Sequence, residues 1–226
     1  MSEVTANESA YEIVESEPAE LLGRNLGSAG HLLASATAFF FLAFVFAYFY
    51  LRSLNNAGMW RPNHVHPSIT LGTIVTALVA AAALVVRLGL ADQRVGRRVQ
   101  CRTKGAIALA LGVAAVVLQI VEWESIDFGP ASGGYASVFF GWTAALMLFL
   151  LGTIYWLETL LATAYRYRNV PHNNPPPGEA SGDRYRTGHD IIEPLSLVTP
   201  GLEALTFYWS FLAGITVLAW VVLYLL

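Results

Sequence analysis

Five stretches of the sequence are each long and apolar enough to cross a lipid bilayer, and this feature constrains the fold more than any other. They lie at about 29–51, 69–91, 105–123, 135–165 and 202–226. A helix needs about 20 mainly apolar residues to cross the hydrocarbon core, where no water is present to bond its backbone groups. The short loops between the stretches leave no room for a sizeable soluble domain. We therefore predict an all-α integral membrane bundle of five transmembrane helices.

Composition excludes several other classes of protein. Only 13% of the residues are charged and 55% are hydrophobic, whereas a soluble domain is about 25% charged. The single cysteine excludes a disulfide-rich scaffold, and the net charge of −3 argues against binding to nucleic acid. The sequence also lacks the motifs GxSxG, HExxH and the phosphate-binding GxxxxGK followed by Ser or Thr. These absences argue against a hydrolase, a zinc protease or a nucleotide-hydrolysing enzyme.

The distribution of charge predicts the domain organisation and the orientation. Residues 1–28 are acidic, and the first twenty contain six glutamates and no basic residue, which argues against a cleavable signal peptide. We interpret this segment as a solvated cytoplasmic tail, and the alternative is a docking segment for a partner protein. Residues 29–226 then form the five-helix domain, with a Pro/Gly-rich cytoplasmic loop at about 167–200.

The positions of the arginines predict which end of the bundle faces the cytoplasm. The loops after the second and fourth stretches hold most of the basic residues, which are Arg94, Arg97, Arg98, Arg102, Lys104, Arg166, Arg168, Arg184 and Arg186. Because basic loops stay on the cytoplasmic side, we predict a cytoplasmic N-terminus and a C-terminus outside.

Ionisable side chains within the apolar stretches are few. Glu158 lies about two turns from the cytoplasmic end of the fourth stretch and is a candidate intramembrane carboxylate. One interpretation is that it carries protons. The other is that it reaches the membrane interface or pairs with a polar group on a neighbouring helix. Glu122 lies at the outer end of the third stretch.

The histidines do not indicate a redox centre. His64 and His66 form an HxH pair in a loop, and the other three histidines also lie away from the middle of the predicted spans. The pair is a metal site only if a third ligand approaches, and the alternative is a pair of hydrogen-bonded loop histidines.

Several segments, taken in order, resemble subunit III of the heme-copper oxidases, the cytochrome c and quinol oxidases. They are ASATAFFFLAFVFAYFYLR, GMWRPNHVHP, LGVAAVVLQIVEWE, SGGYASVFFGWT and EALTFYWSFLAGITVLAWVVLYL. The matching positions include Trp60, His66, Pro67, Gln119, Glu122, Trp123, Tyr135, Ser137 and Trp209. The likeness covers nearly all of residues 29–226.

The sequence departs from this family where the family places polar groups deep in the membrane. The buried glutamate of the family's first helix corresponds to Thr37 or its neighbour here, and its HGxH pair corresponds to residues 146–149. The His and Asp of its last helix become Ser210 and Ala213. The resemblance therefore indicates a divergent member, in which a role that depends on the buried glutamate is not expected.

The resemblance implies a non-catalytic accessory subunit of a bacterial heme-copper oxidase, in the cytoplasmic (inner) membrane and in aerobic electron transport. It implies no catalytic, cofactor or metal site in this chain. Heme and copper are expected in a partner catalytic subunit of the subunit I type. Membrane lipids are a further expected partner. The residues expected to serve structure or lipid and subunit contacts are Arg52, Trp60, His66, Pro67, Gln119, Glu122, Trp123, Tyr135, Ser137 and Trp209.

Two alternatives remain at the level of sequence. One is the subunit-III-like accessory protein of a nitric oxide reductase, which the loss of polar groups from the interior favours. The other is a small membrane transporter, which predicts internal repeats, broken helices or a polar pathway.

Overall fold

The computed structural model describes residues 19–55, 58, 60–62, 65–166, 168 and 197–226. The predicted acidic tail therefore lies largely outside the described residues, as does most of the predicted 167–200 loop. His64 also lies outside them, so the proposed pairing of His64 with His66 has no structural description.

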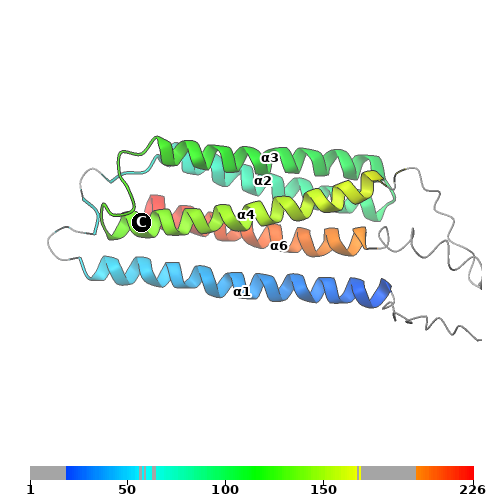
Figure 1. Cartoon of the computed structure of the whole chain (residues 1–226), viewed down its shortest axis with the longest axis horizontal. Helices are drawn as coiled ribbons and strands as arrows, with labels where there is room; N and C mark the ends of the chain where they lie inside the picture. Colours follow the sequence, from blue (N-terminus) through cyan, green and yellow to red (C-terminus); the bar gives the residue numbers. More distant parts are fainter. Residues whose placement is uncertain (1–18, 56–57, 59, 63–64, 167, 169–196) are drawn as a thin grey trace, which may run out of the picture.

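Among the described residues, five long helices form an elongated bundle (Figure 1). Their bounds are α1 Ala19–Ser53, α2 Ile69–Arg94, α3 Arg98–Glu124, α4 Gly134–Arg166 and α6 Val198–Trp220, and the π-helical turn η1 Val221–Leu225 extends α6. All five are long and apolar enough to cross a membrane, which confirms the predicted all-α fold. The predicted boundaries differ most at two helix starts. Helix α1 begins about ten residues earlier than predicted and α3 begins seven residues earlier, because polar residues at a helix end can continue the helix beyond the apolar core.

Local chemistry explains the ends of α2 and the tight turn that follows it. The Ser68 side chain accepts a hydrogen bond from the Leu71 amide and so caps the first turn of α2. At the other end the backbone of Gly96 has φ 77°, a left-handed conformation that glycine adopts without steric cost. The chain therefore reverses within three residues, and α2 and α3 pack side by side as an antiparallel pair.

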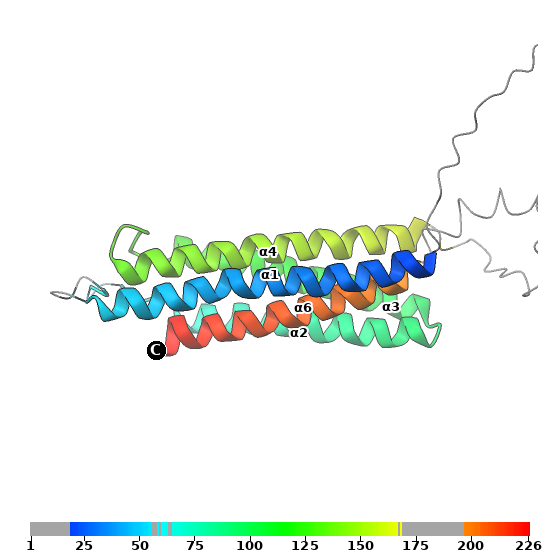
Figure 2. The same ribbon diagram turned by 90° about the horizontal axis from the view of Figure 1, so that it is seen from below.

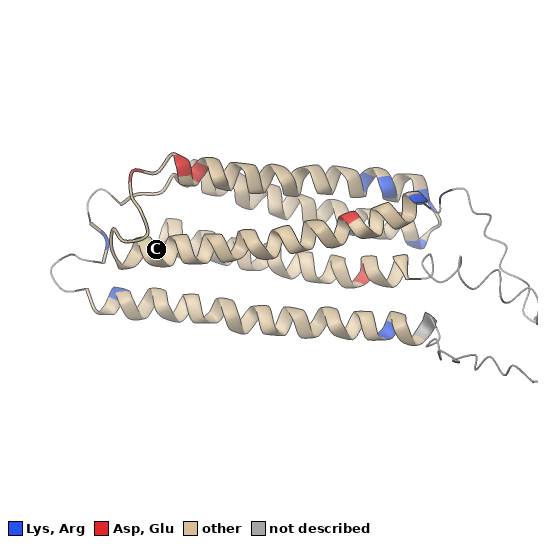
Figure 3. Cartoon of the chain, in the orientation of Figure 1, with Lys and Arg blue, Asp and Glu red and all other residues tan. Residues whose placement is uncertain are grey.

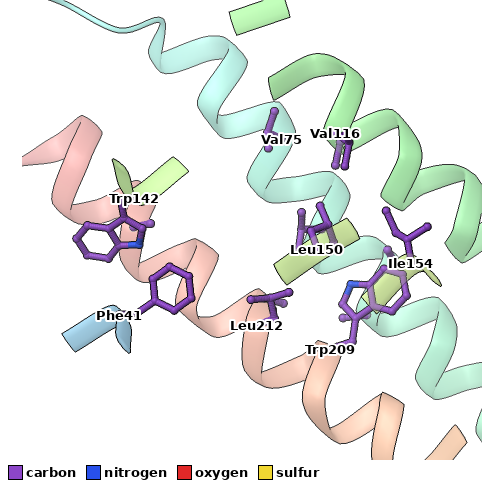
Figure 4. Close-up of a cluster of buried hydrophobic side chains, with 14 of the residues drawn as sticks. Phe41, Val75, Val116, Trp142, Leu150, Ile154, Trp209 and Leu212 are labelled. Carbon is purple, nitrogen blue, oxygen red and sulfur yellow. The ribbon is translucent and has the colours of Figure 1, made fainter. Parts of the chain in front are cut away.

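Helix α6 lies between the α2–α3 pair and α1, and it also packs against α4 (Figures 1 and 2). The largest fully buried side chains include Trp142 on α4 and Trp209 on α6. Figure 4 shows Phe41 of α1 beside Trp142, and Ile154 beside Trp209, in this interior. Helix α1 packs mainly against α6 and α4, and it presents many apolar side chains outward.

Small residues let the helices approach closely at particular points. A Cβ atom at Gly105 would lie 2.5 Å from a methyl group of Leu161, so the absence of a side chain there brings α3 against α4. From the sequence alone, Gly141 and Gly152 are the glycines of the fourth stretch expected to permit such contact. Gly141 does face Phe44, but a Cβ atom at Gly152 would meet nothing within 4 Å among the described residues, so that expectation is wrong for Gly152. Its position on the outer face of α4 explains the difference.

Charged residues gather toward the two ends of the bundle, where the ribbon of Figure 3 is coloured blue or red. One end, where α2 and α4 finish and α1, α3 and α6 begin, holds most of the described arginines, and we call it the arginine-rich end. We call the opposite end, which carries the loop before α2 and the loop before α4, the loop end.

Candidate functional site

Glu122 is the most deeply buried acidic side chain among the described residues. It lies in the last turns of α3 at the loop end and is 0% exposed. Gln119, one turn earlier on the same helix, donates a hydrogen bond from Nε2 to Glu122 Oε2 over 2.9 Å. The Tyr224 hydroxyl donates to Glu122 Oε1 over 2.7 Å. Burial of a carboxyl group is costly unless such donors are supplied, so this arrangement removes a large part of that cost.

The position of Tyr224 depends on a glycine and on the π-helical turn. A Cβ atom at Gly72 on α2 would lie only 2.4 Å from the Tyr224 ring, so the ring lies directly over the Gly72 backbone. Tyr224 belongs to η1, whose wider winding rotates its residues relative to a continued α-helix. In the same turn the carbonyl oxygen of Leu223 accepts a hydrogen bond from the buried hydroxyl of Tyr135 on α4. Hydrogen bonds to Glu122 of α3 and from Tyr135 of α4 therefore fix the position of η1.

The loop before α2 covers this region. Trp60 is 8% exposed and lies edge-on to the rings of Tyr48 and Tyr135, at centroid distances of 5.1 and 5.9 Å. The Trp60 carbonyl accepts a hydrogen bond from the Tyr135 amide at the start of α4. The Arg61 guanidinium lies 4.5 Å from the centre of the Tyr135 ring and also contacts His66 Nδ1 at 3.3 Å. A cation over an aromatic face is attractive, so Arg61 fastens the loop to α4.

These contacts form two groups, which the hydrogen bond from the Tyr135 hydroxyl to the Leu223 carbonyl connects. We call the combined unit the loop-end cluster: Trp60, Arg61, Gln119, Glu122, Tyr135 and Tyr224. It joins α3, α4, the end of α6 and the loop before α2. Both carboxyl oxygens of Glu122 already accept a hydrogen bond from a neighbouring side chain, and the side chain is closed to solvent. The geometry suits a structural junction and offers a substrate no access to the carboxyl group.

The other predicted residues lie around this cluster or away from it. Trp123 donates to the Thr143 hydroxyl over 3.1 Å and so links α3 to α4. Ser137 bonds the Pro130 carbonyl in the preceding loop. Pro67 is buried beside the start of α2. Arg52 is exposed at the end of α1, with its guanidinium 5.9 Å from the Tyr48 ring.

Trp209 lies apart from the others, in the middle of the bundle. It is 0% exposed and packs close to Gly112, where a Cβ atom would lie 3.3 Å from its ring. Its indole N–H has no hydrogen-bond partner among the described residues. An unpaired buried donor costs about 1–3 kcal/mol, so the packing of this ring outweighs a polar penalty.

Glu158 is exposed on the outer surface of α4, unlike Glu122. The described residues offer it no ion pair. Helix α4 has 33 residues, or about 50 Å, and exceeds a hydrocarbon core of about 30 Å by about 10 Å at each end when centred. Glu158 lies eight residues before Arg166, or about 12 Å from the helix end, and so reaches the edge of the hydrocarbon. This placement agrees with the interpretation that the carboxylate meets the interface.

A polar contact joins α1 and α6 at Thr37, one of the two positions that the sequence comparison matched to the buried glutamate of the resembled family. The Thr37 hydroxyl is 1% exposed, donates to the Leu33 carbonyl over 2.7 Å and lies 3.1 Å from the Tyr208 hydroxyl. A pair of hydroxyl groups therefore links the two helices here without an ionisable carboxyl group.

Two groups in these networks were not singled out from the sequence. The sequence gives no reason to select Tyr224, whose partner Glu122 is 102 residues away. It gives none to select Asp92 either, which is 6% exposed near the end of α2 and is paired with Lys104 and Arg97. Spacing carries no signal for these contacts, because Glu122 and Tyr224 lie on α3 and η1, and Asp92 and Lys104 lie on α2 and α3.

Within the described residues, no three His, Cys, Asp or Glu side chains come together in a way that could hold a metal ion. The chain matches no protein-family model, and no curated protein matches it.

Proposed function

We propose that this chain is a non-catalytic accessory subunit of a bacterial heme-copper oxidase, similar to subunit III. Oxygen reduction then takes place in a partner catalytic chain that carries the heme and copper, and this chain stabilises it and binds lipid. The proposal also assigns the protein to the cytoplasmic membrane, with the arginine-rich end in the cytoplasm.

The main support for the proposal is the spatial arrangement of the residues that carry the resemblance to subunit III. Trp60, Gln119, Glu122 and Tyr135 come from three separate motifs and meet in the loop-end cluster. There Gln119 donates to Glu122, and the Tyr135 amide donates to the Trp60 carbonyl. Residues in such an arrangement serve the packing of a scaffold. Its largely apolar outer surface fits contact with lipid and with neighbouring membrane subunits alike.

Copurification tests the proposal. The full chain carries an affinity tag, is expressed in its native host and is extracted in a mild detergent, and mass spectrometry of the intact complex identifies its partners. We expect a heme-bearing chain in the complex, with a heme absorption spectrum and oxygen consumption. Recovery of a heme-free assembly of this chain alone would overturn the proposal.

The accessory protein of a nitric oxide reductase is the second candidate. The hydroxyl pair of Thr37 and Tyr208 favours it, because an ionisable group is missing where an oxidase subunit III carries one. Consumption of nitric oxide without oxygen reduction by the copurified complex would favour this candidate over the first.

Glu158 provides a test of proton transfer. Because the carboxylate is exposed at the edge of the hydrocarbon, we expect Glu158→Gln to leave turnover and proton uptake of the intact complex unchanged. A clear loss of proton uptake, with the complex still assembled, would return the proton-carrying role to this residue.

A further inference from the structure

Among the described residues, the arginine-rich end holds more basic than acidic residues. Asp92 is contacted by Lys104 and Arg97, and Glu203 is contacted by Arg94 at 2.8 Å. Arg98 and Arg102 form no such ion pair with a carboxylate in the described part of the chain. Figure 3 shows several basic residues, coloured blue on the ribbon, close to the start of α3 and the end of α4.

Arg98 and Arg102 lie one helical turn apart on α3, and side chains at this spacing share a face. Arg98 is exposed and Arg102 is half-buried. The Arg102 guanidinium lies 5.2 Å from the centre of the Tyr165 ring on α4, so this arginine is held at the seam between the two helices. Contact of a guanidinium with a ring face does not use its N–H groups, which can still donate to another acceptor.

The surface beside this seam is suited to acyl chains. Toward the middle of the membrane, the exposed side chains of the two helices include Val113 on α3 and Leu151 on α4, both 43% exposed. Glu158 is the one acidic side chain of α4 among the described residues, and it lies seven residues from Tyr165, or about 10 Å deeper. An anionic phospholipid has a negatively charged headgroup above apolar acyl chains. The two arginines match the charge and depth of the headgroup, and the apolar surface below them matches the acyl chains.

We propose that Arg98 and Arg102, at the seam of α3 and α4, bind the phosphate of an anionic phospholipid whose acyl chains lie along the two helices. Basic sites between membrane helices bind such headgroups, and guanidinium groups offer the forked donors that phosphate oxygens accept. The site is set by the two helices themselves and does not depend on the partner complex proposed above. It is distinct from Arg52, which lies at the opposite end of the bundle.

Native mass spectrometry of the purified full chain tests the site. The detergent-solubilised protein is titrated with phosphatidylglycerol, with zwitterionic phosphatidylcholine and, separately, with inorganic phosphate. We expect phosphatidylglycerol to bind more tightly than phosphatidylcholine. A basic residue near a membrane surface contributes about fivefold in affinity, so the double substitution R98Q/R102Q should weaken phosphatidylglycerol binding by about 30-fold.

A matched control removes the same charge from the same end. The double substitution R94Q/R97Q takes away two arginines that already contact carboxylates, so we expect binding to change by less than about threefold. Tyr165→Leu, which removes the ring beneath Arg102, should weaken binding several-fold with the fold intact. Glu158→Gln should leave it unchanged, because that carboxylate lies below the headgroup level.

Three outcomes would overturn the proposal. The first is an equal loss of binding in both arginine pairs, which would indicate general charge attraction. The second is equal affinity for phosphatidylglycerol and phosphatidylcholine. The third is displacement of the lipid by inorganic phosphate at matching concentration, which would indicate a site for a free anion.

Discussion

Gly72→Ala is the substitution that tests the loop-end cluster most directly. The added Cβ would lie 2.4 Å from Tyr224 Cζ and 2.8 Å from its hydroxyl oxygen, and both distances are shorter than any normal contact of a Cβ with a non-bonded atom. Because the ring cannot stay over Gly72, it must move and give up its hydrogen bond to Glu122. One oxygen of a fully buried carboxyl group is then left without its donor.

The expected magnitude follows from three contributions. Loss of the donor to a buried acceptor costs about 1–3 kcal/mol, and the forced repacking costs about 1–3 kcal/mol. Replacement of glycine by alanine inside a helix returns about 1 kcal/mol. We therefore expect Gly72→Ala to lower the free energy of unfolding by about 1–5 kcal/mol.

Equilibrium unfolding by SDS titration in mixed micelles measures this change, with tryptophan fluorescence as the signal. Gly152→Ala is the matched control, because a Cβ there meets nothing within 4 Å, and its stability should stay the same or rise by up to about 1 kcal/mol. In a Tyr224→Ala background the clash is absent, so Gly72→Ala should cost little there. If Gly72→Ala destabilises the chain equally with and without the Tyr224 ring, the proposed contact is refuted.

Three further substitutions follow from the same structure, each measured by unfolding of the purified chain. Trp60→Ala should cost about 3–5 kcal/mol because it empties a buried aromatic site, whereas Tyr155→Ala, at a 67% exposed position, should cost less than about 1 kcal/mol. Asp92→Asn should cost about 1–3 kcal/mol because it removes a buried carboxylate contacted by two cations. Its control, Glu203→Gln, breaks an exposed ion pair and should cost less than about 1 kcal/mol. Equal losses of stability in the two variants would contradict the importance of burial at Asp92. Glu122→Leu should cost about 2–4 kcal/mol because it strands two donors, and an unchanged midpoint would show that their hydrogen bonds contribute nothing.

The five helices could be predicted from the sequence because each depends on a local run of apolar residues. Their exact starts could not, since the first turns of α1 and α3 contain polar residues that hydropathy assigns to loops. The two glycines of α4 show the same limit at the level of packing. Gly141 meets a neighbour and Gly152 does not, and only the rotation of α4 within the bundle decides which of them faces another helix.

The two carboxylates of the α3 and α4 spans show why the candidate site was harder to predict. Counting residues along the apolar stretches predicts that Glu158 lies deeper in the membrane than Glu122, which lies at the end of its stretch. In the structure Glu158 faces outward and Glu122 is fully enclosed. Enclosure depends on Tyr224, which a turn of π-helix at the far end of the sequence carries into place. Depth can be counted in residues, but exposure depends on neighbours that are distant in sequence.

The packing of α1 has a consequence for synthesis in the cell. This helix packs mainly against α6 and α4, and α6 begins roughly 145 residues after α1 ends. At about 5–20 residues per second, a ribosome takes on the order of 10–30 s to make the intervening chain. During that interval α1 sits in the bilayer without its principal neighbour, and the Thr37 hydroxyl has only its own helix to bond. The face of α1 that packs against α6 is therefore made early in synthesis but is covered only after α6 has been made.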